Sequence, residues 1–335
     1  MIDLTHSNEE VAQQVWADHG AEGDETFNAT LTRPLLYGVG GVTADPERYA
    51  RICNRVVDLT DNTERRATFL LEVPNGLRRV GGVWDAKEVS DAMDQTLAGI
   101  ANVAPGPRKD RLLGLHAYHG GIVYRELGEF DKAALAQEES ARLGSDPNIN
   151  GISLFCAAVE WAHYALVVGD PELIAEKLAV LRAAVPPLMA LDGSNQDVRR
   201  WQLASRPAHL LYSHWLAGQK YNEWQADMEA FQHLPEDLAK TFKPWVVVLL
   251  AVDYLEIMEQ PGVAIEIADG VLIEDGQPAT TALAMLVAAR AHQVNHLMSI
   301  AKVLLRAIVN LPGHGAYFVR AVAKRDLEAL ASAKS

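Results

Sequence analysis

Histidine pairs at helical spacing are the residues of this sequence whose types and spacing could do chemistry. His116 and His119 stand three positions apart, and His292 and His296 stand four apart. On a helix each pair would share one face and could supply two ligands to a metal ion, with a carboxylate as a third. No H-E-x-x-H sequence accompanies either pair. We therefore interpret these histidines as packed or hydrogen-bonded, keep them as weak metal candidates and expect no cofactor.

Paired acids and tryptophans are a second pattern that could carry chemistry. Asp253 and Glu256 lie one helical turn apart in a chain that holds seven tryptophans. A helical glycosidase would need two carboxylates across an aromatic cleft. Neither Cys53 nor Cys156 stands in a nucleophile motif, and the glycine-rich stretches match no phosphate-binding fingerprint. An all-helical hydrolase or metal-dependent enzyme therefore stays an alternative, and a ligand-sensing regulatory module is a second one.

The composition limits the partners and the location that we expect. Lys and Arg total 30 against 44 Asp and Glu, a net charge of -14, which repels phosphate backbones, so we expect no nucleic-acid partner. Two cysteines in unrelated contexts are typical of a reducing compartment. The polar N-terminus shows no signal segment, and the apolar run 245–252 is too short to cross a bilayer. We expect an acidic, soluble, cytoplasmic protein without membrane contact.

Helix-starting signals recur along the chain. Ser7 and Glu10 form a capping box, and Asp45 and Asp170 each precede a proline and a glutamate. Asp85 opens another helix, with Val89, Met93 and Leu97 predicted on its packed face. These signals predict a helical chain.

The N-terminal region contains one ambiguous segment and ends at a break. The segment 69–84, with Pro74-Asn75-Gly76, reads either as a β-hairpin or as a helix end followed by a loop. We prefer the second reading, because no other strand is available for pairing. Pro105-Gly106-Pro107 then interrupts the pattern, so we predict an N-terminal helical region, 1–105, that could cap a second domain, 106–335.

The segment 111–147 has the pattern of two amphipathic helices joined by the glycine turn 127–130. Small residues, Gly121 and Ala133, stand where the two helices would cross. From residue 114 onward the segment resembles the tetratricopeptide-repeat family, whose repeat is a helical hairpin of about 34 residues. Degenerate turns follow at 168–169, 217–218, 260–261 and beside Ala301. The resemblance implies an all-α, tetratricopeptide-like α-solenoid of antiparallel helix pairs with a right-handed superhelix.

The resemblance also implies a concave groove lined by the first helix of each hairpin. Transferred position by position, the groove residues are Tyr118, Ile122, Arg125, Glu126, His163, Tyr212, Trp215, Asp253, Glu256 and Arg290. Aromatic residues with a few charges favour a docking peptide or helix. The carboxylate clamp of some family members is absent, because Tyr118 and Ile122 occupy its positions. We expect a non-catalytic scaffold or adaptor that binds a protein or peptide, and we keep a homo-oligomer among the expected assemblies.

Overall fold

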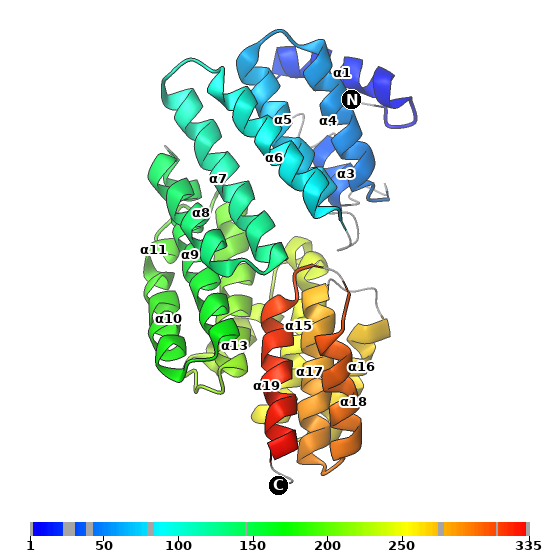
Figure 1. Ribbon diagram of the computed structural model, residues 1–335, viewed down its shortest axis with the longest axis vertical. Helices are drawn as coiled ribbons and strands as arrows, with labels where there is room; N and C mark the ends of the chain where they lie inside the picture. The colour runs from blue at the N-terminus through cyan, green and yellow to red at the C-terminus, as the bar shows by residue number, and fades with distance from the viewer. Residues whose placement is uncertain are drawn as a thin grey trace. The chain divides into compact units, whose positions relative to one another are not determined.

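The computed structural model describes residues 3–22, 31–37, 43–78, 84–144, 146–273, 278–312 and 314–332 (Figure 1). These residues form helices and connecting turns and contain no β-strand, so the all-α prediction is confirmed for them. The solenoid arrangement stays a prediction. The chain divides into two compact units, one of residues 1–123 with 139–146 and one of residues 124–138 with 147–335. The predicted domain boundary near residue 105 likewise stays a prediction.

The first unit is a cluster of antiparallel helices around α4. Helix α4 packs against α1, α3 and α5, and α5 packs in turn against α6. The buried side chains of α4, Tyr49, Ile52 and Val56, meet Phe69 and Val73 of α5 in its core. The helices of this unit are α1 (Asn8–Glu22), α3 (Arg33–Tyr37), α4 (Pro46–Leu59), α5 (Thr63–Leu77), α6 (Ala86–Ala101) and most of α7 (Pro107–Leu127).

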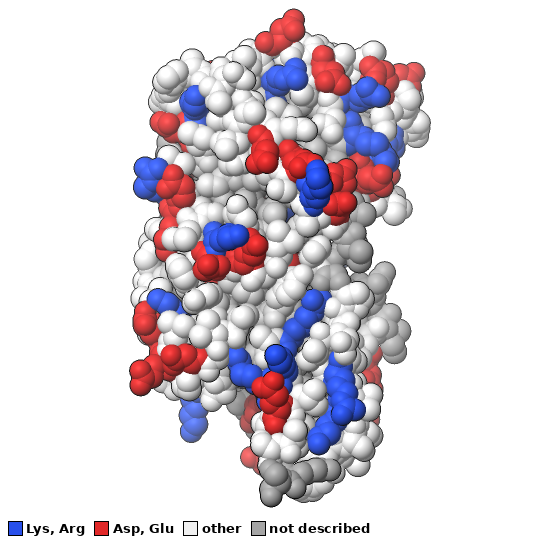
Figure 2. Space-filling view, in the orientation of Figure 1, with Lys and Arg blue, Asp and Glu red and all other residues white. Residues whose placement is uncertain are grey.

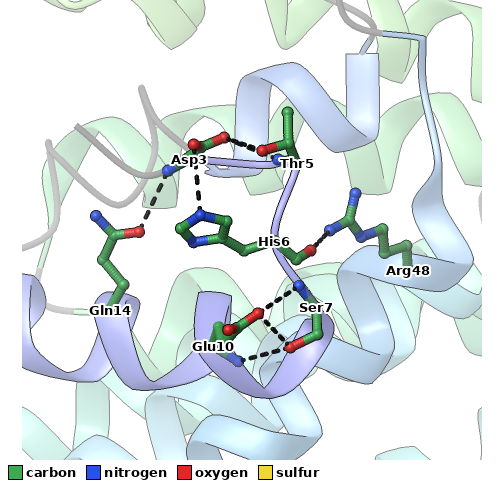
Figure 3. A network of polar contacts seen from close by, with 7 residues as sticks. All are labelled: Asp3, Thr5, His6, Ser7, Glu10, Gln14 and Arg48. Atoms are coloured by element: carbon green, nitrogen blue, oxygen red, sulfur yellow. Dashed lines mark hydrogen bonds and ion pairs between the residues drawn. The ribbon is translucent and has the colours of Figure 1, made fainter.

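A network of polar contacts fixes the start of α1 (Figure 3). The backbone N–H of Ser7 donates to Glu10 Oε2 at 2.9 Å, and the N–H of Glu10 donates to Ser7 Oγ at 3.3 Å, so the predicted capping box is confirmed. Arg48 of α4 donates to the carbonyl of His6 at 2.7 Å and to Asn8 Oδ1 at 3.0 Å. These bonds tie α4 to the beginning of α1.

The segment 69–84 is helical from residue 69 to residue 77. Helix α5 runs through Pro74 to Leu77, so the β-hairpin interpretation is wrong there, and residues 79–83 lie outside the described residues. Gly76 serves helix packing instead of a turn: a Cβ at this position would lie 2.9 Å from the carbonyl oxygen of Pro46. The Asn-Gly signal therefore marks a close approach of α5 to α4.

The packed face of α6 differs from the predicted one. Helix α6 begins after the N-cap Asp85, as predicted, but its buried side chains are Val89, Ala92, Thr96 and Ile100. Leu97, expected on that face, is exposed. The Thr96 hydroxyl donates to the carbonyl of Leu70 at 2.8 Å. This bond satisfies the buried Thr96 hydroxyl at the contact with α5. The pattern of apolar residues alone predicts a packed face that runs through Leu97 instead of Thr96.

The second unit is a run of helices that pack on their sequence neighbours. Its helices are the end of α7, the part of α8 (Phe130–Leu143) up to residue 138, α9 (Pro147–Val168), α10 (Pro171–Ala183), α11 (Val185–Met189), α12 (Gln196–Arg200), the π-helical turn η3 (Trp201–Ser205), α13 (Arg206–Leu216), α14 (Trp224–Gln232), α15 (Glu236–Glu256), α16 (Pro261–Ile273), α17 (Pro278–Val294), α18 (Met298–Val309) and α19 (Tyr317–Ser332). Helices α15 to α19 lie side by side (Figure 1). Helix α19 also packs against α9, far back in the sequence.

Three of the predicted turns end their helices on a glycine with positive φ. Gly128 and Gly169 both have φ of 81°, and Gly218 has φ of 63°. Glycine ends a helix in this conformation at little steric cost. After Gly169, the carboxylate of Asp170 accepts a bond from the backbone N–H of Glu172 at 2.9 Å and so caps α10, as predicted.

Helix α9 is long and apolar enough to cross a membrane by length and composition. From the sequence we considered only the run 245–252, which belongs to α15, as a candidate membrane span. Two thirds of the most apolar window of α9, 67%, is buried within the protein, and Glu160 and His163 lie in its buried part. A core helix of a folded domain has these properties.

Candidate binding face

Three buried polar residues and the half-buried His209 form a connected cluster between α9 and α13. Glu160 Oε2 lies 3.0 Å from His163 Nδ1, and His163 Nε2 lies 2.8 Å from the Tyr212 hydroxyl. His209 Nδ1 also contacts that hydroxyl. Glu160, His163 and Tyr212 are each about 1% exposed. We call these four residues the histidine–tyrosine cluster.

With neutral histidines, the hydrogen bonds of this cluster run in one direction. The carboxylate of Glu160 can only accept, so His163 Nδ1 donates to it and His163 Nε2 accepts. The Tyr212 hydroxyl then donates to His163 Nε2 and accepts from His209 Nδ1. Every one of these contacts is therefore satisfied without placing a charge on either imidazole.

Burial holds two members of the cluster in their neutral forms. It raises the pKa of Tyr212 well above its ordinary value, and the charge of Glu160 adds to this rise. Burial also lowers the pKa of His209 well below its ordinary value, with the nearby His163 and Arg125 acting in the same direction. Arg125 Nη1 lies 3.4 Å from Glu160 Oε1 and supplies a positive partner for that buried carboxylate.

Aromatic rings surround the histidine–tyrosine cluster. Phe318 of α19 stacks on the imidazole of His163 with ring centroids 4.2 Å apart. Trp245 of α15 stacks on Tyr212 at 5.4 Å, and Trp201 of η3 stacks on His209 at 5.9 Å. Each imidazole and the phenol therefore stacks on an aromatic ring from another element.

A second group of side chains adjoins this cluster one turn further along α13. Trp215 Nε1 donates to Glu256 Oε1 of α15 at 3.0 Å, and the guanidinium of Arg290 of α17 lies over the Trp215 ring at 4.6 Å. Arg290 Nε also donates to Asp326 Oδ2 of α19 at 2.9 Å. We call Trp215, Glu256, Arg290 and Asp326 the tryptophan–arginine cluster.

The two clusters bring together five of the ten residues predicted for the groove. His163 meets Tyr212 in one cluster, and Trp215, Glu256 and Arg290 meet in the other. These residues belong to four different helices of the second unit: α9, α13, α15 and α17. We call the side of the second unit that is formed by these five residues the binding face. In this structure His163, Tyr212 and Trp215 are buried and do not line an open groove.

The other predicted groove residues lie in different surroundings. Asp253 Oδ1 accepts a bond from Trp224 Nε1 at 2.9 Å, and the carbonyl of Glu126 accepts one from Gly315 N–H at 2.9 Å. Tyr118 and Ile122 belong to the first unit. The ring of Tyr118 lies 6.0 Å from that of His119.

The histidines proposed as metal candidates do not form a ligand set. His119 Nδ1 donates to the carbonyl of Leu71 at 3.2 Å, and burial lowers its pKa to about 4. His292 and His296 do not share a helix face, because α17 ends at Val294 and His296 has a φ of 59°. Within the described ranges, no three histidine, cysteine, aspartate or glutamate side chains gather so as to hold a metal ion.

A surface hollow of about 360 Å³ lies in the first unit, apart from the predicted groove residues. Arg51 and Arg55 line it together with Glu9 and Asp58. Arg55 Nε lies 3.7 Å from Glu9 Oε2, and Arg51 pairs with Glu47. Because positive and negative groups alternate here, the hollow offers no concentrated charge to a ligand.

Several residues of the two clusters had no place in our sequence predictions. Glu160 and His163 form an E-x-x-H sequence, which we overlooked when searching for metal-binding motifs. That local signal would have paired the two residues on one face of α9. Phe318 and Asp326 carry no comparable signal, because their partners lie far back in the sequence.

Comparison with known proteins adds no relative. No protein-family model matches the sequence, and no curated protein matches it. The case for a function therefore rests on the geometry of the second unit.

Proposed function

We propose that this protein is a non-catalytic scaffold that binds a protein or peptide through the binding face of its second unit. One observation carries the proposal. Residues assigned to a single groove by the repeat pattern, on four different helices, are in mutual contact in two adjoining clusters. Such agreement between distant positions is expected when the first helices of successive hairpins share one side.

The chemistry of the tryptophan–arginine cluster supports recognition of another chain. Tryptophan and arginine are the residue types that dominate binding energy at protein interfaces. Glu256 is exposed, and the side chains of Arg290 and Asp326 are 21% and 24% exposed. Trp215 itself is buried, and the exposed or partly exposed charges around its ring provide polar groups that can set the register of a partner.

Burial argues against catalysis by the histidine–tyrosine cluster, which contains the acid and base groups that the enzyme alternative requires. Its carboxylate, one imidazole and its phenol are almost completely covered, so no substrate atom reaches them in this conformation. A general base must come within hydrogen-bonding distance of the proton that it removes. We therefore assign the cluster no catalytic role and regard it as the buried floor of the binding face.

The charge distribution favours a partner that is not a polyanion. In the view of Figure 2, Lys and Arg side chains lie scattered among Asp and Glu, between large uncharged areas. Together with the net charge of -14, this arrangement offers no continuous basic tract on the face in view. A protein or peptide with an apolar side and mixed charges is the better complement.

Charge reversal at the exposed edge of the binding face tests this function. We expect Glu256→Lys to weaken binding of any partner recovered with the full-length protein by about tenfold or more, because it removes the acceptor of Trp215 Nε1 and reverses a rim charge. Glu266→Lys on α16 is the matched control, since Glu266 is also an exposed helical glutamate. Affinities would be measured by calorimetry with the recovered partner. Equal affinity for both variants and the wild type would refute the proposed face.

A further inference from the structure

Helix α19 carries an apolar side that lies against the rest of the second unit. Phe318, Val319, Val322 and Ala323 are buried, at the i, i+1, i+4 and i+5 positions of one helix face. Residues Lys324 and Glu328 on its other side are exposed. Helix α19 is thus an amphipathic helix, and it packs against α9, α17 and α18.

Phe318 is the anchor at the beginning of this helix. Its ring stacks on His163 at 4.2 Å and on Tyr212 at 5.6 Å, and it meets Phe130 edge-on at 6.2 Å. His163 and Tyr212 are two of the residues that the repeat pattern assigns to the groove. The aromatic anchor of α19 therefore sits on the histidine–tyrosine cluster.

Arg325, two helical turns further on, binds the end of α9. Its Nη1 donates to the carbonyl oxygen of Leu166, in the last turn of α9, where carbonyls lack partners within the helix. Gly169 makes room for this contact, because a Cβ at that position would lie 2.6 Å from Arg325 Nη1. The C-terminal end of α9 and Gly169 together form a binding site for the guanidinium group of Arg325.

Asp326 completes the contact by pairing with Arg290, a third predicted groove residue. A fourth, Glu126, accepts a backbone bond from Gly315, just before α19 begins. Helix α19 and its leading turn thus contact predicted groove residues on α7, α9, α13 and α17. An aromatic anchor flanked by charged contacts is how a helix docks into a groove of another protein.

We propose that α19 is an internal ligand, which occupies the binding face until a partner helix of the same chemistry displaces it. This inference rests on the proposed function and names its ligand class. The partner is an amphipathic helix with an aromatic residue at position i, an apolar residue at i+4, an arginine at i+7 and an acid at i+8, the pattern of Phe318, Val322, Arg325 and Asp326. The aromatic residue at position i stacks on His163 and Tyr212. The arginine at i+7 and the acid at i+8 set the register of the helix through the Leu166 carbonyl and Arg290.

The packing of α19 makes its release less costly than the release of a central helix. Helix α17 buries apolar residues on all sides, whereas α19 holds its place through one apolar side and two partly exposed charged contacts. Local opening of an element costs less free energy when it breaks fewer buried contacts. While attached, α19 competes with a partner at an effective concentration in the millimolar range, so the protein resists weak or unrelated helices.

A labelled peptide of residues 314–332 tests the proposal with full-length protein. In the double variant Phe318→Ala/Asp326→Lys the attached helix is weakened, while His163, Tyr212 and Arg290 keep their side chains. We expect the peptide to bind this variant at least about tenfold more tightly than it binds the wild type, measured by fluorescence anisotropy. The matched control, Glu328→Lys, changes an exposed charge of α19 and should bind the peptide like the wild type.

A charge exchange tests the register of the bound peptide. Adding Arg290→Glu to the double variant should weaken peptide binding about tenfold, and a peptide carrying Asp326→Lys should restore it. The proposal is overturned if the peptide binds no variant that circular dichroism shows to be folded, or if binding ignores the exchange.

Hydrogen exchange of the wild type gives a second test, should the double variant not fold. We expect the amides of residues 319–327 to exchange at least about a hundredfold faster than those of residues 283–289 in α17. Equal protection would mean that α19 opens only when the whole unit unfolds, which would overturn the proposal.

The outcomes separate this inference from the proposed function. If the peptide never binds but Glu256→Lys still weakens a recovered partner, α19 is a fixed part of the unit and the proposed function stands. If the peptide binds in register and Glu256→Lys changes no partner, α19 is exchangeable and the proposed partner face is wrong.

Discussion

Tyr212 is the residue on which the buried hydrogen bonds of the second unit converge. Its hydroxyl joins two imidazoles from different helices, and its ring stacks on both Trp245 and Phe318. A single oxygen thereby satisfies a donor and an acceptor that would otherwise be left unpaired away from water. Leaving such a group without a hydrogen-bond partner costs more stability than a satisfied hydrogen bond contributes.

Removing this oxygen should destabilise the protein without changing its packing. We expect Tyr212→Phe to lower the free energy of unfolding by roughly 1–3 kcal/mol, because it leaves His163 Nε2 and His209 Nδ1 unsatisfied. Tyr164→Phe is the matched control, since the Tyr164 hydroxyl forms no hydrogen bond with the described residues. Urea unfolding of the three proteins is the measurement, and equal midpoints for all of them would contradict this role of the hydroxyl.

Single residues also mark how far the sequence alone could lead. The contact between Glu160 and His163 was predictable, because an i, i+3 pair on a helix must share a face. The stacking of Phe318 on His163 was not, since nothing near either residue indicates the other. The repeat pattern predicted positions such as His163 and Tyr212 that are in contact in the structure, but it gave no sign that α19 covers them.

At the scale of helices, the local signals were reliable where the chemistry is local. Ser7, Asp45, Asp85 and Asp170 each cap the helix that they were predicted to start, because a cap bonds only to its own first turn. The predicted packed face of α6 was right at Val89 and wrong at Leu97, because Thr96, beside Leu97, faces α5 and donates to the carbonyl of Leu70. Which face of a helix is buried, and which helix it packs against, depend on other parts of the chain that a local sequence pattern does not reveal.

Gly128 and Gly218 distinguish the requirements of a turn from those of a helix contact. Both have positive φ, but a Cβ at Gly128 would lie 2.7 Å from Tyr317 Cγ, at the start of α19, whereas a Cβ at Gly218 meets nothing within 4 Å. We expect Gly218→Ala to cost about 1–2 kcal/mol of backbone strain alone. Gly128→Ala should cost more and should also increase binding of the 314–332 peptide.

Thermal unfolding and peptide anisotropy of the two alanine variants would measure this difference. The rigid base of the Tyr317 side chain cannot move aside without shifting α19, so the two substitutions should separate clearly. Matching melting temperatures, with equal peptide binding, would show that α19 does not depend on this turn.

The molecule as a whole consists of two compact units. Trp16 and Trp84 lie in the first unit, and the other five tryptophans, Trp161, Trp201, Trp215, Trp224 and Trp245, lie in the second. Tryptophan fluorescence therefore reports mainly on the second unit, whereas far-ultraviolet circular dichroism reports on the helices of both. The two probes can separate the stabilities of the units.

We expect urea unfolding curves from the two probes not to coincide. A core substitution in the first unit, Val56→Ala, should shift part of the dichroism curve and leave the fluorescence midpoint unchanged. Val287→Ala in α17 is its counterpart and should shift the fluorescence midpoint. Superimposable curves for the wild type and parallel shifts in both variants would show a single cooperative transition instead.

The contact between α9 and α19 also bears on how the protein is made. The carbonyl of Leu166 accepts a hydrogen bond from the guanidinium of Arg325, which is 159 positions later in the chain. At typical ribosome speeds of 5–20 residues per second, roughly 8–30 seconds pass between their synthesis. During that interval the apolar surface of α9 lacks part of its final cover. A nascent chain stalled before α19 should therefore recruit chaperones more strongly than the completed chain.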